Sequence, residues 1–304
     1  MPELPDIVVY VEALERRIVG TKLLAIKLRS VSLLRTVTPP YRTVEGHTVQ
    51  AVRRMAKRIV IELDGGLFMV FHLMRLGRFR WADTGTKAKN AGGKVLHGSF
   101  EFERGTLFLT EMGTKKRASL HVLDDAAAVA DLDRGGVEVL DIDLAAFANV
   151  LRSENHTLKR ALTDPRLLSG IGNAYSDEIL HAARMSPVKL TQKLTDDEVQ
   201  QLFTATKDTL EKWTKVLRDE VGDGFPEKVT AFREGMAVHG RFRQPCPVCG
   251  KEVQRIAYAD RETNYCAQCQ TGGRPLADRG LSRLLGKDWP KTLEELEERR
   301  GGGS

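Results

Sequence analysis

The chain has 304 residues, of which 41% are hydrophobic and 29% charged, and its formal net charge is +6 at pH 7. A chain of this length can bury a substantial core, and we expect about two domains. No apolar run approaches the roughly 18 residues of a membrane-spanning helix, and the acidic N-terminal stretch differs from a signal peptide. We therefore expect a soluble cytoplasmic protein with no membrane partner. The positive charge favours a polyanionic partner such as nucleic acid.

The first part of the chain predicts one helix followed by β-strands. Residues 7–18 place apolar side chains at helical spacing, and Gly20 follows them, so we expect the helix to end there. Short apolar or alternating runs separated by Gly and Pro then predict strands. These runs are residues 22–34, 47–63, 66–74, 97–103 and 106–111. Together they predict a mostly antiparallel β-sandwich with an attached helix over residues 1–135, ending at Gly135 and Gly136.

Residues 136–235 are predicted to be helical. The segments with helical patterns are residues 143–153, 158–167, 174–185 and 195–220. The last segment begins at Thr195, with Glu198 three residues later, which is the pattern of a capping box. Gly172 precedes Asn173, and a glycine before a helix start lets the backbone approach an anion such as phosphate. Alternatively, Asn173 is an ordinary helix N-cap.

The four cysteines of the chain predict a metal site. Cys246, Cys249, Cys266 and Cys269 form two Cys-x-x-Cys pairs separated by sixteen residues. This spacing is typical of zinc bound by four thiolates, and four protein ligands leave no position for a substrate. We therefore expect one structural Zn²⁺ in a zinc-finger β-hairpin over residues 236–272. Two disulfides are the alternative, which a reducing cytosol disfavours. Residues 273–304 are a C-terminal extension whose final GGGS resembles a linker.

The order of the motifs is more distinctive than any single motif. Pro-Glu-Leu-Pro at the N-terminus is followed by Lys57 in a basic strand, by LKRALTD and SGIGNAYSDEIL, and by the four-cysteine finger. From residue 2 to about residue 271, the chain thereby resembles the formamidopyrimidine-DNA glycosylase and endonuclease VIII family of DNA repair enzymes. The resemblance implies an α+β fold: a two-layered β-sandwich with a helix, a helix–two-turn–helix domain and a zinc-finger hairpin. It implies excision of oxidised bases from damaged DNA, and we expect a monomer.

The resemblance gives the N-terminus a catalytic role. In this family the initiator Met is removed, and Pro2 becomes the nucleophile that forms an iminium with C1′ of the sugar. The iminium makes the C2′ proton acidic, so that β- and δ-elimination cleave the strand. Glu3 corresponds to the general acid, and Lys57 to a lysine that contacts the phosphate beside the damaged nucleotide. Without the other motifs, Pro2 and Glu3 would be interpreted as a solvent-exposed terminus, and Lys57 as one more lysine of a basic strand.

Three further residues correspond to family residues at or near the bound DNA. Asn173 matches the phosphate-binding asparagine of the two-turn motif, and Lys159 matches a lysine near the active site. Arg261 in the finger matches an arginine that binds the same phosphate region.

Several positions depart from the family pattern. Asp6 stands where the family usually has Glu. The family fills the space left by an extruded base with a Met from one loop and an Arg-Phe pair from another. Here HLMRLG places Arg75 at the Met position, and EMGTKKRASL contains Arg117 but no aromatic residue. We take Arg75 and Arg117 as candidate DNA-binding residues of these two loops.

These departures bear on the lesion that is removed. Extruding a base costs a few kcal/mol, and without an aromatic wedge we expect weak extraction of well-stacked 8-oxoguanine. Lesions that unstack by themselves, such as ring-opened purines, hydantoins and abasic sites, should be processed better. The segment 222–241 is also shorter than the family loop that caps 8-oxoguanine. A glycosylase for oxidised pyrimidines or hydantoins is therefore an alternative.

Two other functions are weighed against excision. A protein that binds lesions or abasic sites without excising them would share the basic surface and the finger, but it would not need Pro2 and Glu3. A ribosomal or topoisomerase-like helix–two-turn–helix protein could share SGIGN, but it would lack the N-terminal motif and the terminal finger.

Overall fold

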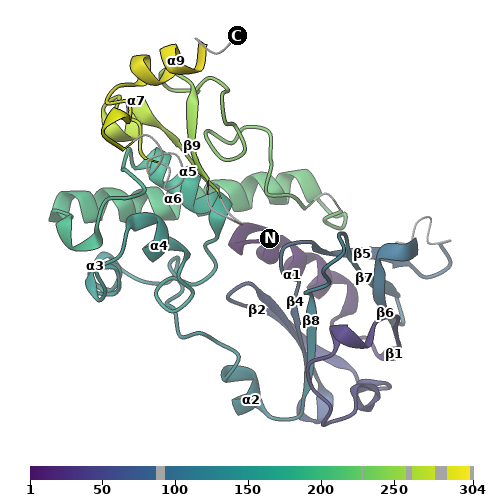
Figure 1. Cartoon of the computed structure of the whole chain (residues 1–304). Helices are drawn as coiled ribbons and strands as arrows, with labels where there is room; N and C mark the ends of the chain where they lie inside the picture. The colour runs from purple at the N-terminus through teal and green to yellow at the C-terminus, as the bar shows by residue number, and fades with distance from the viewer. Residues whose placement is uncertain (87–92, 228, 258–261, 278–285, 302–304) are drawn as a thin grey trace. The chain divides into compact units, whose positions relative to one another are not determined.

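The computed structural model describes residues 1–304 except 87–92, 228, 258–261, 278–285 and 302–304 (Figure 1). Arg261, the expected finger arginine, lies outside the described residues. The chain divides into two compact units. The first comprises Met1–Gly135 and Glu211–Ala231, and the second comprises Gly136–Leu210 and Phe232–Ser304. Among the helices of the described ranges, none has the length and apolar character to cross a membrane.

Helix α1, Leu4–Ile18, opens the first unit and is fixed by its own sequence. Pro5 lies in its first turn, and the Asp6 carboxylate accepts a hydrogen bond from the Glu3 backbone N–H at 2.9 Å, as in a capping box. Asp6 is therefore long enough to cap the helix although it is shorter than Glu. Gly20 follows with a φ of 77°, which a glycine adopts without strain. The helix expected over residues 7–18 is confirmed.

Two four-stranded antiparallel sheets form the layers of the first unit. One has the strand order β1-β6-β7-β5 and the other β2-β3-β4-β8. The strands are β1 Leu23–Leu28, β2 Val49–Met55, β3 Arg58–Leu63, β4 Leu67–His72, β5 Gly77–Asp83, β6 Leu96–Phe102, β7 Gly105–Glu111 and β8 Ser119–Leu123. Each predicted run contains a strand, but β5 and β8 were not predicted. In β5 the arginines Arg78 and Arg80 alternate with Phe79 and Trp81, a strand pattern only four residues long, and the ladder with β7 shows that it is a strand.

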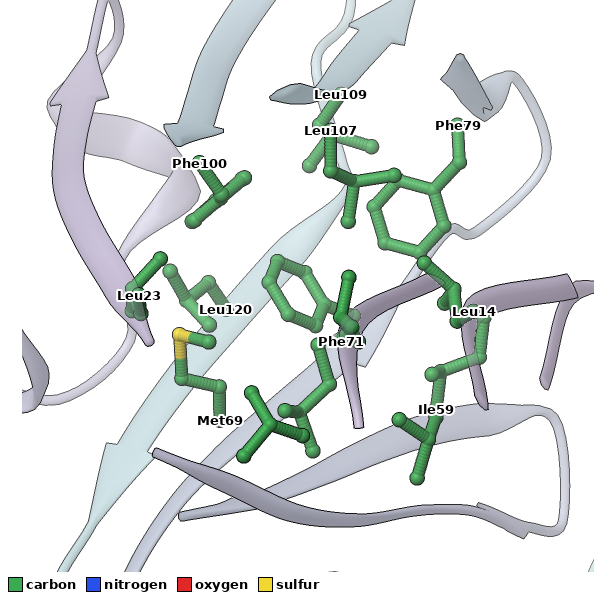
Figure 2. Packing of buried hydrophobic residues seen from close by; sticks show 14 of the residues in the cluster. Leu14, Leu23, Ile59, Met69, Phe71, Phe79, Phe100, Leu107, Leu109 and Leu120 are labelled. Carbon is green, nitrogen blue, oxygen red and sulfur yellow. The ribbon is translucent and has the colours of Figure 1, made fainter. Parts of the chain in front are cut away.

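The main core lies between the two sheets and α1. Figure 2 shows side chains from all three layers meeting there. Phe71 packs edge-on against Phe79 and Phe100, with ring centroids 5.2 and 5.0 Å apart. A smaller cluster on the outer face of the second sheet packs against α2, Ala126–Ala130. The predicted β-sandwich is confirmed.

The helical part begins after the Gly135–Gly136 pair. Its helices are α3 Leu144–Arg152, α4 Leu158–Thr163, α5 Asn173–Ala182 and α6 Asp196–Val221. The predicted capping box is present, because the Thr195 N–H donates to Glu198 Oε2 at 3.0 Å and the Glu198 N–H donates to Thr195 Oγ1 at 3.3 Å. Single-turn 3₁₀ helices occur at Val31–Leu33, Tyr41–Val44, Asp64–Gly66, Gly93–Val95, Thr191–Lys193 and Gly286–Asp288.

The zinc-finger segment forms the expected hairpin. Strands β9, Val253–Ala257, and β10, Glu262–Cys266, pair antiparallel and lead into α7, Ala267–Thr271. The C-terminal extension packs on this hairpin. The sequence did not predict this packing. The extension contains helix α9, Leu293–Gly301, and places three leucines against the hairpin core. In addition, the Leu276 N–H donates to the Tyr265 hydroxyl at 2.6 Å.

Candidate functional site

Pro2 and Glu3 are buried at the start of α1. Pro2 is buried, and Glu3 is only 2% exposed. The hydrogen bond from the Glu3 N–H to Asp6 fixes the backbone of this segment at the first turn of the helix. The interpretation of these residues as a solvent-exposed terminus is therefore wrong.

The surroundings of the N-terminus disfavour a protonated amine. Burial lowers the pKa of the Met1 α-amino group from its ordinary value of 8.0. The Glu3 and Asp6 carboxylates oppose this effect, while the positive charges of Arg78 and Lys57 reinforce it. An amine with a lowered pKa is more often neutral near pH 7, which is the state a nucleophile needs.

Lys57 lies in the tight turn between β2 and β3. Met55 pairs with Arg58, so Ala56 and Lys57 form a two-residue hairpin connection, and Ala56 takes the positive φ of 53° that such turns require. Lys57 is half-buried. Burial lowers the pKa of its ammonium group, and the nearby Glu3 carboxylate acts in the opposite direction. The turn thus places Lys57 within electrostatic range of the N-terminal residues.

The structure adds His72 and Arg78 to this neighbourhood. His72 ends β4 and pairs in the ladder with Arg58. Burial lowers the pKa of His72 to about 4, and the charges of Arg58 and Lys57 contribute, so His72 is neutral near pH 7. Neither His72 nor Arg78 was singled out from the sequence, where His72 lies within the predicted run 66–74 and Arg78 lies in a segment with no predicted strand. Strand pairing places His72 near Lys57, and Arg78 lies near the N-terminal amine.

Arg75 and Arg117 are both exposed, on two loops at one end of the β5–β7 pair. The Arg117 N–H donates to the buried Glu111 carboxylate at 2.9 Å. The carbonyl oxygen of Arg75 accepts from Arg78 Nη1 at 3.3 Å. The two loops therefore present their guanidinium groups to solvent from a braced backbone.

In the second unit, Lys159 and Asn173 lie together. Lys159 Nζ donates to the Asn173 carbonyl oxygen at 2.7 Å and to Asp177 Oδ1 at 2.5 Å. Helix α5 begins at Asn173 with Gly172 as its N-cap, so Asn173 is not the N-cap that the alternative interpretation expected. Instead, Asn173 Nδ2 donates to the carbonyl oxygen of Glu262 in β10 at 2.9 Å. The SGIGN motif is thus linked directly to the finger hairpin.

The carboxylates of Asp177 and Glu178 hold several segments of the second unit together. Asp177 lies 2.8 Å from His239 Nδ1 and accepts from the backbone N–H of Asn264 at 3.2 Å. Glu178 accepts from three successive backbone N–H groups at 2.7–2.9 Å, those of residues 237–239. These contacts fix the segment before the finger against α5.

The four cysteine sulfurs fit a zinc ion. All four lie within 4.8 Å of one another, with Cys246 3.9 Å from Cys269 and Cys249 3.4 Å from Cys266. Thiolates about 2.3 Å from a tetrahedral zinc are about 3.8 Å apart, whereas disulfide sulfurs are about 2.05 Å apart. The disulfide alternative is therefore wrong. His181 Nε2 lies 3.3 Å from the Cys246 sulfur and braces this ligand from outside the metal site.

Three family models match consecutive parts of the chain. The formamidopyrimidine-DNA glycosylase N-terminal domain matches residues 1–116, and the H2TH domain of the same enzymes matches residues 137–221. A zinc finger found in FPG and IleRS matches residues 243–272. Together with the sulfur geometry, this match identifies one structural Zn²⁺ site.

Curated relatives cover from about half to most of the chain. The formamidopyrimidine-DNA glycosylase of Thermus thermophilus is 31% identical over 284 residues, which is 90% of this chain and 100% of that protein. An uncharacterised formamidopyrimidine-DNA glycosylase-like protein of Mycobacterium tuberculosis is 41% identical over 150 residues, covering 49% of this chain and 93% of that protein.

Solved structures show the same fold. Lactococcus lactis formamidopyrimidine-DNA glycosylase bound to DNA with an AP site has a TM-score of 0.74 and 26% identity, covering 88% of this chain and 99% of that one. The same enzyme bound to DNA with an oxidised pyrimidine has a TM-score of 0.75 and 26% identity, covering 89% and 100%. The Thermus thermophilus protein has a TM-score of 0.73 and 28% identity, covering 90% and 100%.

Proposed function

Because the chain belongs to the formamidopyrimidine-DNA glycosylase family of base-excision repair enzymes, we propose that it excises oxidised bases from DNA with Pro2 as the nucleophile. It then cleaves the strand at the abasic site it has made. The observation that carries this proposal is the buried N-terminus, where Pro2 and Glu3 lie within range of the Arg78 and Lys57 charges.

The proposed chemistry requires that Met1 is removed. With Met1 attached, the Pro2 nitrogen is an amide without nucleophilicity, whereas the free terminus is a secondary amine. Burial and the nearby charges of Arg78 and Lys57 lower the pKa of the Met1 amine. The same influences would act on the Pro2 amine. Its lone pair attacks C1′, the C1′–N bond to the base breaks, and the base leaves with the bonding electrons.

Strand cleavage follows from the intermediate. Pro2 then loses its N–H proton, and the C1′–O4′ bond breaks with its electron pair going to O4′, which leaves an iminium between Pro2 and C1′. The iminium withdraws electrons from the sugar and makes the C2′ proton acidic, so the 3′ phosphate is lost by β-elimination and the 5′ phosphate by δ-elimination. Glu3, adjacent to the nucleophile and 2% exposed, protonates the sugar ring oxygen or the leaving base as a general acid.

Several residues are proposed to bind the DNA backbone. The proposed phosphate contacts are Lys57 in the first unit and Asn173 in the second. Lys159 supports Asn173 by donating a hydrogen bond to the Asn173 carbonyl oxygen. Arg261 is proposed as the finger's phosphate contact. Zinc holds the finger hairpin together, so metal binding and DNA binding should be coupled through the folding of this module.

We also propose the lesion class, the compartment and the assembly state. Neither exposed loop carries an aromatic residue, so poorly stacked lesions should be better substrates than 8-oxoguanine paired with cytosine. Excision of oxidised pyrimidines or hydantoins is the corresponding alternative specificity.

The protein is proposed to act as a monomer in the cytoplasm, at the nucleoid.

The direct test is covalent trapping. Borohydride reduces an iminium to a stable adduct, so the wild type should cross-link to lesion-bearing duplexes while Pro2→Gly should not. Glu3→Gln should abolish excision, and both variants should bind DNA within about tenfold of the wild type. Mass spectrometry of the active protein should show that Met1 is absent. Tight binding to lesions without any adduct would instead support the non-catalytic alternative.

A further inference from the structure

Two exposed apolar side chains stand side by side at the end of the β5–β7 pair. Leu76 is 38% exposed and Met112 is 67% exposed. Gly77 and Glu111 form the terminal register pair of these antiparallel strands. Leu76 immediately precedes this pair and Met112 immediately follows it, so the two residues flank the same end of the ladder. Leu76 Cδ1 would lie only 2.9 Å from a Cβ on Gly113, so it touches the turn that carries Met112.

The turn that carries Leu76 is rigid. The Gly77 N–H donates to the Leu73 carbonyl oxygen at 2.9 Å and closes the turn. A side chain at Gly77 would lie 2.2 Å from that oxygen, so only glycine fits there. Met74 is held with a φ of 53°, in the left-handed region. This closed turn directs Arg75 and Leu76 outward, since both are exposed.

The loop that carries Met112 is braced from below. The Glu111 carboxylate, 2% exposed, accepts from the backbone N–H groups of Arg117 at 2.9 Å and Ala118 at 3.1 Å. The Glu111 carbonyl oxygen also accepts from Lys116 Nζ. Both ends of the loop 112–117 are therefore tied to one buried residue, and Met112 projects from a fixed base.

Arg78 connects the turn that carries Leu76 with the surroundings of the N-terminus. Arg78, two residues after Leu76, is near enough to the N-terminal amine to lower its pKa. Arg78 Nη1 also donates to the Arg75 carbonyl oxygen at 3.3 Å. The same two loops also carry the exposed cationic residues Arg75, Lys115 and Arg117. Apolar side chains and cations on the same two loops complement a base step flanked by phosphates.

We propose that Leu76 and Met112 together form an aliphatic wedge that enters the base stack where the target nucleotide has been extruded. Proteins that unstack or kink duplex DNA commonly insert Leu or Met between base steps. The proposal rests on the excision function proposed above. Leu76 and Met112 fill the space left by the extruded nucleotide, and Arg75 and Arg117 contact phosphates. An aliphatic wedge fills volume but does not stack as a plate, which agrees with the proposed preference for poorly stacked lesions.

The test reports on insertion and does not require catalysis. A duplex carries a tetrahydrofuran abasic analogue with 2-aminopurine as the neighbouring base, whose fluorescence rises when it is unstacked. The wild type should raise the fluorescence, and Met112→Ala combined with Leu76→Ser should abolish most of the rise. Leu24→Ser is the matched control, because Leu24 is 47% exposed on β1, outside these loops. Thermal melting checks that each variant folds.

A second measurement compares two forms of one substrate. Single-turnover excision of a paired lesion should fall about 10- to 100-fold in the double variant, whereas excision from a single strand should fall less than about threefold. A wild type that leaves 2-aminopurine fluorescence unchanged overturns the wedge, as do equal losses on both substrates. A fluorescence rise in the wild type without any borohydride adduct would support the wedge and reject Pro2 catalysis, so the two proposals fail separately.

Discussion

The Lys159 ammonium group lies 2.5 Å from the Asp177 carboxylate, whose side chain is completely buried. The same carboxylate contacts His239 and Asn264, while Lys159 also holds the Asn173 carbonyl oxygen. One ion pair thereby joins α4, α5, the segment before the finger and β10.

Breaking this ion pair should destabilise the protein strongly. Lys159→Met leaves the Asp177 carboxylate buried without its ammonium partner, so we expect a loss of about 3–5 kcal/mol in the free energy of unfolding, measured in urea. The control is Lys189→Met, which removes a partly exposed pair with Glu198 and should cost about 1 kcal/mol or less. Equal losses in the two variants would contradict a special role for the Lys159–Asp177 pair.

His181 should strengthen zinc binding. Its Nε2 lies 3.3 Å from the Cys246 sulfur, and hydrogen bonds from outside the ligand shell orient the ligands. His181→Leu should weaken zinc affinity about 10- to 100-fold, measured by competition with a chromogenic chelator. His47→Leu serves as the control, because His47 pairs with Asp64 in the first unit and should leave zinc affinity unchanged.

Stability should depend on pH through His72. Its folded pKa of about 4 lies below the ordinary 6.5, so the unfolded chain takes up the proton first as the pH falls. The stabilisation is fully present above pH 6.5 and is lost as the pH falls toward 4, by about 1–3 kcal/mol. His72→Gln should flatten the dependence of the unfolding free energy on pH in this window. An unchanged slope would show that His72 does not titrate as expected.

Arg78 should tune the proposed nucleophile. Its positive charge helps to lower the pKa of the N-terminal amine, so Arg78→Met should raise that pKa. Because only the neutral amine attacks, the rise of the single-turnover trapping rate with pH should shift to higher pH. Arg80→Met, on the same strand and exposed, should leave the profile in place. Identical profiles for Arg78→Met and the wild type would rule out this influence.

The lesion preference can be measured in one duplex. We expect single-turnover excision of a hydantoin, or trapping at an abasic site, to be faster than excision of 8-oxoguanine opposite cytosine, because less stacking must be broken. A strong preference for paired 8-oxoguanine would contradict the proposed substrate class. Undamaged duplex provides the control for non-specific cleavage.

Features that depend on neighbouring residues were evident from the sequence alone. The cysteine spacing predicts the zinc site because each Cys-x-x-Cys pair forms its own turn. Thr195 and Glu198 predict the start of α6 because a capping box is complete within four residues. The order of motifs from Pro2 to Cys269 predicts the family, since each motif is local and the order adds specificity.

Features that depend on strand pairing were decided only by the tertiary structure. Strand β5 is recognised through its ladder with β7, and the Gly77–Glu111 pair at the end of that ladder brings Leu76 and Met112 together. The sequence alone showed only that the two loops lack an aromatic residue. It did not show that Leu76 and Met112 are neighbours, because side-chain neighbours across a ladder follow from register and not from local pattern. His72, Arg78 and the Asp177 contacts were missed for the same reason: burial and charge proximity exist only after segments distant in sequence have packed together.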